Sequence, residues 1–279
     1  DPKDAFRKSD WSTGNRSKSF RYAKLLNEVA AALRGEFPDV SIGGEAYHDL
    51  VHPPRDVEID PTTTIWFAAS MRDGCRPIAA VAGSVVNERI YRWLEEWKKN
   101  YRGRLILYEY YMGLHARASM PYPISEVICR DWDALKKLGV AGATVQCWSS
   151  NHSVYVLNNL VFARCGWHDD GDHREVLDDY LLGAYGAAAE DVRPIFAGML
   201  RAVSERAAAK AAFWPYSGRD IGPLLDAVGR DNIPAVLDAA RRRAQNDRER
   251  RQVEKLSAAV RYWLWADEAY KLQGKLGGM

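Results

Sequence analysis

The sequence is poor in cysteine, and its few cysteines lack the spacing of a metal site. The four are Cys75, Cys129, Cys147 and Cys165, separated by 54, 18 and 18 residues. None belongs to the C-x₂-C pair that zinc sites use. We therefore expect no bound metal.

Three further absences exclude other classes of protein. No apolar run reaches the roughly 18 residues of a membrane span, so we expect no membrane partner. Neither sign of charge dominates, because 39 lysines and arginines face 37 acidic residues, so we expect no nucleic-acid partner. The sequence has no G-x-G-x-x-G or Walker-type loop, which argues against an α/β enzyme acting on phosphate-bearing substrates. We expect no cofactor and a small or neutral partner.

The first residues also lack an initiator methionine, a signal-peptide core and any helix or strand pattern. The chain opens on Asp1, and residues 9–19 are polar. This pattern is typical of a chain cut from something longer. The sequence then does not determine the cellular compartment, and a periplasmic or secreted location is favoured over the cytoplasm.

Aromatic side chains with a polar edge are abundant. The chain has ten tryptophans and fourteen tyrosines against seven phenylalanines. Such side chains suit the C–H faces of sugar rings, and they equally suit a core rich in large residues. Composition alone leaves both interpretations open.

Hydrophobic periodicity predicts alternating helices and strands over the first part of the chain. A helix is expected over 20–34, where apolar residues recur every three or four positions, and a loop over the proline-containing segment 48–61. Helical patterns also follow the second, third and fourth strands. Strands are expected at 40–47, 62–70, 105–112 and 143–149. This alternation predicts a parallel α/β architecture.

From residue 172 onward the strand patterns stop. Asp172 and Glu175 have capping-box spacing at the start of a helix, and helices are expected over about 190–213, 222–243 and 246–272. Clustered arginines in the last two are interleaved with acidic residues, which indicates a solvated helix face. We predict a partial barrel over 1–170 and a helical domain over 171–279.

Four segments together resemble one bacterial family. They are NEVAAALRGEFPDVSIGGEAYHDLVHPP at 27–54, RLILYEYYMG at 104–113, LKKLGVAGATVQCWS at 135–149 and REVLDDYLLGAYGAAAEDV at 174–192. The resemblance is to domain of unknown function 4838, a group that is similar to (β/α)₈ TIM-barrel glycoside hydrolases and distantly to α-glucuronidases and hexosaminidases. Some of its members act on N-acetylglucosamine linkages.

The resemblance implies that the four strands are the fifth to eighth of a barrel. The half-barrel upstream, with its own carboxylate, would then be missing. We expect such a fragment, expressed alone, to expose strand edges and to aggregate or dimerise.

Chemistry in such barrels lies at the C-terminal ends of the strands. Glu45 and Glu109 are the candidate catalytic carboxylates. The candidate carbohydrate-binding residues near strand ends are Tyr47, His48, Arg72, Tyr111, Trp148 and Asn151. Arg72 suits a carboxylate, either of a uronic acid or of a catalytic glutamate. Trp148 suits stacking on a sugar ring, and packing beneath the helices is its alternative.

Glu109 is the strongest candidate, because it is the single charge in LILYEYYM at 105–112. A lone charge in a buried strand is costly unless it is paired or used. Alternation puts Leu107, Glu109 and Tyr111 on one face of the strand. Two roles for Glu109 are open. It acts in catalysis, or it forms a buried pair with an arginine that only holds strands together.

Three functions follow as hypotheses. The first is a glycoside hydrolase acting on N-acetylhexosamine or uronic-acid glycosides with paired carboxylates. The second is a noncatalytic carbohydrate-binding protein on the same barrel. The third is an unrelated α/β enzyme acting on phosphate-bearing substrates.

Overall fold

The computed structural model describes most of the chain. The described residues are 18–70, 72–79, 83–112, 123–147, 152–208 and 221–276. Contacts divide them into two compact units, each described here by itself. The first unit consists of the chain up to Arg72, Ile78–Tyr110 and Asp133–Gln146. The second unit consists of Asp73–Pro77, Tyr111–Trp132 and the chain from Cys147 onward. The predicted domain boundary at residue 170 stays a prediction.

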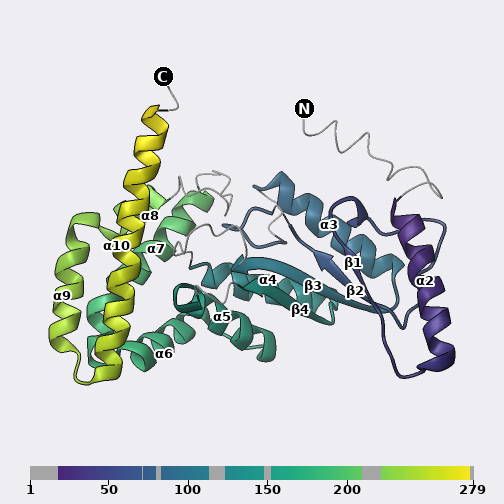
Figure 1. Cartoon of the computed structure of the whole chain (residues 1–279), viewed down its shortest axis with the longest axis horizontal. Helices are drawn as coiled ribbons and strands as arrows, with labels where there is room; N and C mark the ends of the chain where they lie inside the picture. The colour runs from purple at the N-terminus through teal and green to yellow at the C-terminus, as the bar shows by residue number, and fades with distance from the viewer. Residues whose placement is uncertain are drawn as a thin grey trace. The chain divides into compact units, whose positions relative to one another are not determined.

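A four-stranded parallel sheet forms the centre of the first unit (Figure 1). Its strands are β1 (Gly43–Ala46), β2 (Thr64–Ala68), β3 (Arg104–Met112) and β4 (Gly142–Cys147). They lie in sequence order, and β1 pairs with β2 and β2 with β3 in parallel. The predicted α/β class is confirmed, and the arrangement is consistent with half of a barrel followed by a helical region.

The sheet has two unlike faces. Register aligns Ala46 with Phe67 and Phe67 with Leu107, and all three are buried. Parallel strands in sequence order, joined by right-handed crossovers, place their connecting helices on one side. We call the side of Phe67 and Leu107 the covered face.

Three helices accompany the strands: α2 (Lys18–Glu36), α3 (Val85–Asn100) and α4 (Ser125–Leu138). Leu26 of α2 lies over Gly44, on the covered face. The Ser84 side chain caps α3 by accepting a hydrogen bond from the Asn87 N–H. A 3₁₀ turn, η3 (His48–Leu50), follows β1 inside the predicted loop.

The second unit is largely helical. Its helices are α5 (His152–Trp167), α6 (His173–Tyr185), α7 (Ala189–Ala208), α8 (Ile221–Val228), α9 (Ile233–Arg243) and α10 (Asp247–Leu276) (Figure 1). Asp172 caps α6 as predicted, since its side chain accepts from the Arg174 N–H. Two 3₁₀ turns are η6 (Gly186–Ala188) and η8 (Arg230–Asn232). Leu181, Val192, Leu225 and Val253 are among the core residues with no exposed surface.

One predicted helix is wrong. The segment 222–243 is two helices, because Gly229 adopts a left-handed φ of 79° and is followed by η8. Left-handed backbone ends a helix and costs glycine little. Pro234 then takes an early position in α9, where its missing N–H is harmless.

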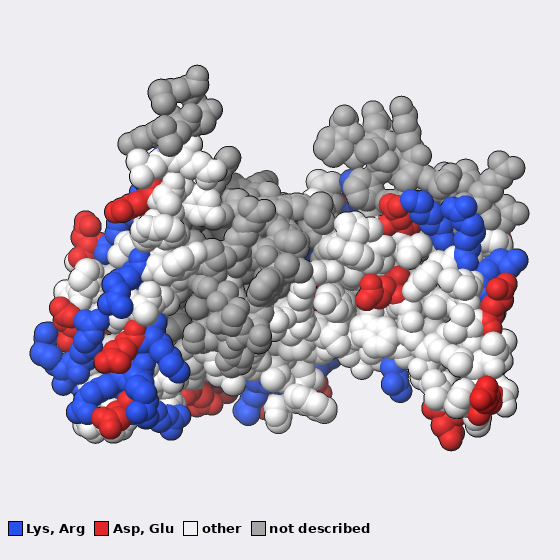
Figure 2. Space-filling view, in the orientation of Figure 1, with Lys and Arg blue, Asp and Glu red and all other residues white. Residues whose placement is uncertain are grey.

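The arginine-rich surface of α9 and α10 is interleaved with acids, as predicted. Arg241 pairs with Asp238, and Arg250 pairs with Asp247. Figure 2 shows the two signs mixed over these helices. Among the described residues, no helix combines the length and apolar character needed to cross a membrane.

A disulfide joins Cys129 of α4 to Cys165 of α5, 36 residues apart. Both cysteines belong to the second unit. The spacing of the cysteines in the sequence did not predict this bond.

Candidate functional site

The C-terminal end of β1 presents Glu45 to solvent. Glu45 is exposed, whereas its neighbours Gly44 and Ala46 are buried. The Glu45 backbone N–H donates to the Tyr22 hydroxyl of α2 at 3.1 Å, which holds the strand end. Glu45 therefore lies opposite the covered face, with its carboxylate accessible.

Trp66 is the neighbour of Glu45 on β2. The two Cα atoms are register partners, so both side chains leave the sheet on the same side. A Cβ atom built on Gly43 would overlap the Trp66 indole, so the indole extends over this glycine. Glycine at position 43 thus makes room for a large aromatic surface beside the carboxylate.

Two tyrosines of β3 continue the same side of the sheet. Tyr108 and Tyr110 alternate with the buried Leu107 and Glu109, and both are half-buried. Their ring centroids lie 5.2 Å apart in an edge-on arrangement. We define the open face as Glu45, Trp66, Tyr108 and Tyr110.

Tyr47 and His48 follow Glu45 directly. The Tyr47 ring is half-buried and lies 3.9 Å from the His48 ring, centroid to centroid. His48 is exposed and has a φ of 49°, in the left-handed region that non-glycine residues seldom adopt. Strained backbone of this kind concentrates at functional sites. Glu45, Tyr47 and His48 thus form one polar end of β1.

Glu109 lies on the covered face and is bound to Arg72. Arg72 Nη1 donates to Glu109 Oε1 at 2.7 Å, with the two side chains 5% and 2% exposed. Glu109 Oε2 accepts from the Tyr110 N–H at 2.9 Å. This contact is the buried pair with an arginine that the sequence left open as the alternative to catalysis by Glu109, and substrate binding by Arg72 stays a prediction. Glu109 and Glu45 lie on opposite faces of the sheet, which does not favour their acting as one catalytic pair.

Tyr111 belongs to the second unit and is buried. Its hydroxyl donates to Asp131 Oδ2 of α4 at 2.6 Å, a contact that orients the ring. It follows Glu109 by two positions, and alternation places both on one side of β3, as expected. Trp148 and Asn151, the other two candidates, lie outside the described residues.

Sequence reasoning did not select Trp66, Tyr108 and Tyr110. The sequence feature that could have identified them is the alternation within TIWFA and LILYEYYM, which assigns the side chains of each strand to two opposite faces of the sheet. Assigning one set to the open face required the register with β1.

The open face offers one carboxylate and several aromatic rings. A carboxylate accepts hydrogen bonds or exchanges a proton, and aromatic faces stack on C–H surfaces. No group of three or more potential metal-binding side chains occurs among the described residues.

The fold and this site define a parallel α/β protein with a polar and aromatic strand-end surface and an appended helical region. The chain belongs to the family described as domain of unknown function (DUF4838), whose model matches residues 3–197. The search of curated proteins and the search of solved structures found no match.

Proposed function

We propose that this chain supplies a carbohydrate-binding surface of a glycoside hydrolase, with Glu45 as one of its working carboxylates. The observation that carries the proposal is the register of Glu45 with Trp66, which sets an accessible carboxylate beside a large aromatic ring. The substrate class is an N-acetylhexosamine or uronic-acid glycoside.

Position within the fold supports the proposal. In α/β sheets with parallel strands, ligands bind at the carboxyl ends of the strands. Glu45 is the penultimate residue of β1, Tyr108 is the central residue of β3, and Tyr110 lies in the C-terminal half of β3. A sugar on this surface would meet the Trp66 and tyrosine rings while its hydroxyls reach Glu45 and His48.

Hydrolysis needs two carboxylates, one giving a proton to the leaving oxygen and one attacking or activating water. Glu45 is exposed and free to move, which suits either task. Glu109 is buried on the other face and hydrogen-bonded to Arg72. In this proposal Glu109 is a positioning residue that fixes β3. The second catalytic carboxylate is then a residue outside the open face.

A noncatalytic carbohydrate-binding protein is the second candidate. It is favoured by one observation: among the described residues, Glu45 is the only carboxylate of the open face. A lone carboxylate with aromatic neighbours suffices for binding.

The test measures binding and hydrolysis with the same oligosaccharides. Chitooligosaccharides and glucuronate-bearing oligosaccharides are titrated calorimetrically against the chain, and released reducing ends are quantified. Binding with hydrolysis that falls at least about a hundredfold in Glu45→Gln supports the glycosidase. Binding without product supports the noncatalytic alternative, and absence of both contradicts the proposal.

Two variants sharpen the result. Trp66→Ala should weaken binding by about tenfold or more, the scale of losing one well-placed aromatic surface. Glu95→Gln, which removes an exposed carboxylate on α3, should change neither binding nor hydrolysis. Equal effects of Glu45→Gln and Glu95→Gln would refute the role of Glu45.

A further inference from the structure

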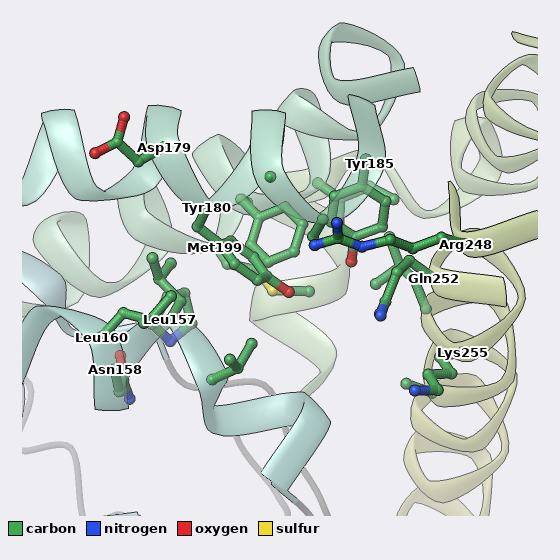
Figure 3. A pocket seen from close by; sticks show the side chains of 18 of the residues that line it. Leu157, Asn158, Leu160, Asp179, Tyr180, Tyr185, Met199, Arg248, Gln252 and Lys255 are labelled. Atoms are coloured by element: carbon green, nitrogen blue, oxygen red, sulfur yellow. The ribbon is translucent and has the colours of Figure 1, made fainter. Parts of the chain in front are cut away.

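The second unit contains a cavity that the carbohydrate proposal does not use. It has a volume of about 440 Å³ and is bounded by side chains of α5, α6, α7 and α10 (Figure 3). This volume is within the range of small-molecule binding sites.

An aromatic cluster forms one wall. The Tyr180 ring centroid lies 5.7 Å from that of Phe196 and 6.0 Å from that of Tyr185. Burial raises the pKa of both Tyr180 and Tyr185 above the ordinary value of 10.0. Both are therefore neutral at physiological pH, and Leu157 and Met199 extend the apolar wall.

Small residues of α6 leave the space open. Gly183 and Ala184 both line the cavity, and a Cβ atom on Gly183 would meet no atom within 4 Å. The cavity thus reaches the backbone of α6, and a larger side chain at position 183 would enter it.

The side facing α10 carries cations. Arg248, Gln252 and Lys255 are spaced by four and three residues, so they share one face of the helix. Figure 3 shows Arg248 directed from α10 toward the tyrosines, with Gln252 and Lys255 following it along the helix.

The two cations of this face, Arg248 and Lys255, form no ion pair with the described residues, as is also true of Arg251 on the same helix. Arg243 pairs with Asp191 and Arg250 with Asp247. Asp179 also lines the cavity, but its carboxylate points away from the α10 side chains (Figure 3).

We propose that this cavity binds an amphipathic carboxylate, with the carboxylate at Arg248 and Lys255 and the apolar body against Tyr180 and Phe196. Charge complementarity selects an anion, because two cations that form no ion pair within the described residues border a largely apolar space. The apolar wall selects an aryl or alkyl body over a sugar. This site lies within the second unit and does not depend on the open face of the sheet.

The experiment compares ligands that differ in one group. The chain is titrated calorimetrically with 4-phenylbutyrate, 4-phenyl-1-butanol, 4-phenylbutylamine and octanoate. We expect 4-phenylbutyrate to bind at least about tenfold more tightly than the alcohol, the amine to bind least, and affinity for the acid to fall with salt. The affinity of octanoate, compared with that of 4-phenylbutyrate, shows whether the cavity prefers an alkyl acid or an aryl acid.

Three variants locate the binding. Arg248→Gln combined with Lys255→Gln should remove the preference of the acid over the alcohol, whereas Arg251→Gln, an exposed change on the same helix, should leave it intact. Gly183→Leu should occupy part of the cavity and weaken binding of both compounds, with thermal unfolding used to verify folding.

Equal affinity for acid and alcohol, unchanged binding in folded Gly183→Leu, or no binding up to about 1 mM would overturn the proposal. Oligosaccharide binding by Gly183→Leu should be unchanged, so failure here is distinguishable from failure of the carbohydrate proposal.

Discussion

Arg72 Nη1 donates to Glu109 Oε1 at 2.7 Å, and neither side chain exceeds 5% exposure. Glu109 belongs to β3, and Arg72 follows the end of β2. The bond therefore joins the segment that follows β2 to the C-terminal half of β3. Its burial makes the loss of either partner alone more costly than the loss of both.

Arg72→Met should lower the free energy of unfolding by about 3 kcal/mol or more, because it leaves the Glu109 charge buried without its guanidinium. Adding Glu109→Leu should restore part of that loss. Urea denaturation of both single variants and the double variant gives the coupling energy directly. A loss below about 1 kcal/mol in Arg72→Met would contradict a stabilising pair.

Reduction of the Cys129–Cys165 disulfide should destabilise the second unit. A bond that closes a loop of 36 residues restricts the unfolded chain by about 3 to 4 kcal/mol in the chain-entropy treatment. Dithiothreitol should lower the melting temperature of the native chain and leave that of the Cys129→Ala, Cys165→Ala double variant unchanged.

Thiol titration provides the matching check. Cys75 and Cys147 form no disulfide in the structure, so the unfolded, non-reduced chain should react at two thiols and the reduced chain at all four. Four reactive thiols before reduction would refute the disulfide.

Stability should fall as the pH drops from about 6.5 toward 4, because of His52. Burial, then Arg55 and Arg89, lower the pKa of His52 from 6.5 to about 4 in the folded chain. In this window the unfolded chain binds the proton and the folded chain resists it, so acid favours unfolding. We expect a loss of roughly 1 kcal/mol between pH 7 and pH 5, about half of what the undiscounted pKa shift would give over this range, because His52 is partly exposed.

His52→Phe isolates this effect. It keeps the ring that contacts Trp93, with 4.5 Å between centroids, and removes the proton. The pKa of Asp60 is lowered from 3.8 to about 2 by hydrogen bonds from Thr62 and Arg34, so its loss of stability lies below pH 4. Parallel stability curves for the native chain and His52→Phe between pH 6.5 and 4 would exclude the assignment.

Gly198→Ala should destabilise the helical unit by about 1 to 3 kcal/mol, because α7 and α8 approach closely there. A Cβ atom at this position would lie 2.8 Å from the Val228 Cα, a backbone atom that cannot rotate away. Gly183→Ala is the control: nothing lies within 4 Å of its Cβ, so it should be neutral or slightly stabilising. Melting temperatures of the two variants should therefore move apart.

The sequence predicted the order of strands and helices because periodicity records which side of an element is buried. The segment 105–112 was recognised as a strand and matches β3 within one residue at its start. The single helix expected over 222–243 was wrong because Gly229 can continue a helix or leave it, and apolar spacing alone does not distinguish these.

The candidate site was only partly predictable, for a related reason. Alternation placed Glu109 with Leu107 and Tyr111, and the side chains follow that pattern. Which face of the strand meets the helices depends on contacts distant in sequence, such as Leu26 over Gly44. The open-face aromatics and the Cys129–Cys165 bond likewise required three-dimensional proximity.

The two faces of the sheet differ in which side chains can be replaced without disturbing the packing of the first unit. Phe67 and Leu107 are closed in by packing, and their replacement would be felt throughout the first unit. Trp66 and Tyr108, one position away along the same strands, are only half-buried. Related chains could therefore diverge in ligand preference through alternate positions of β2 and β3 while inheriting the same scaffold.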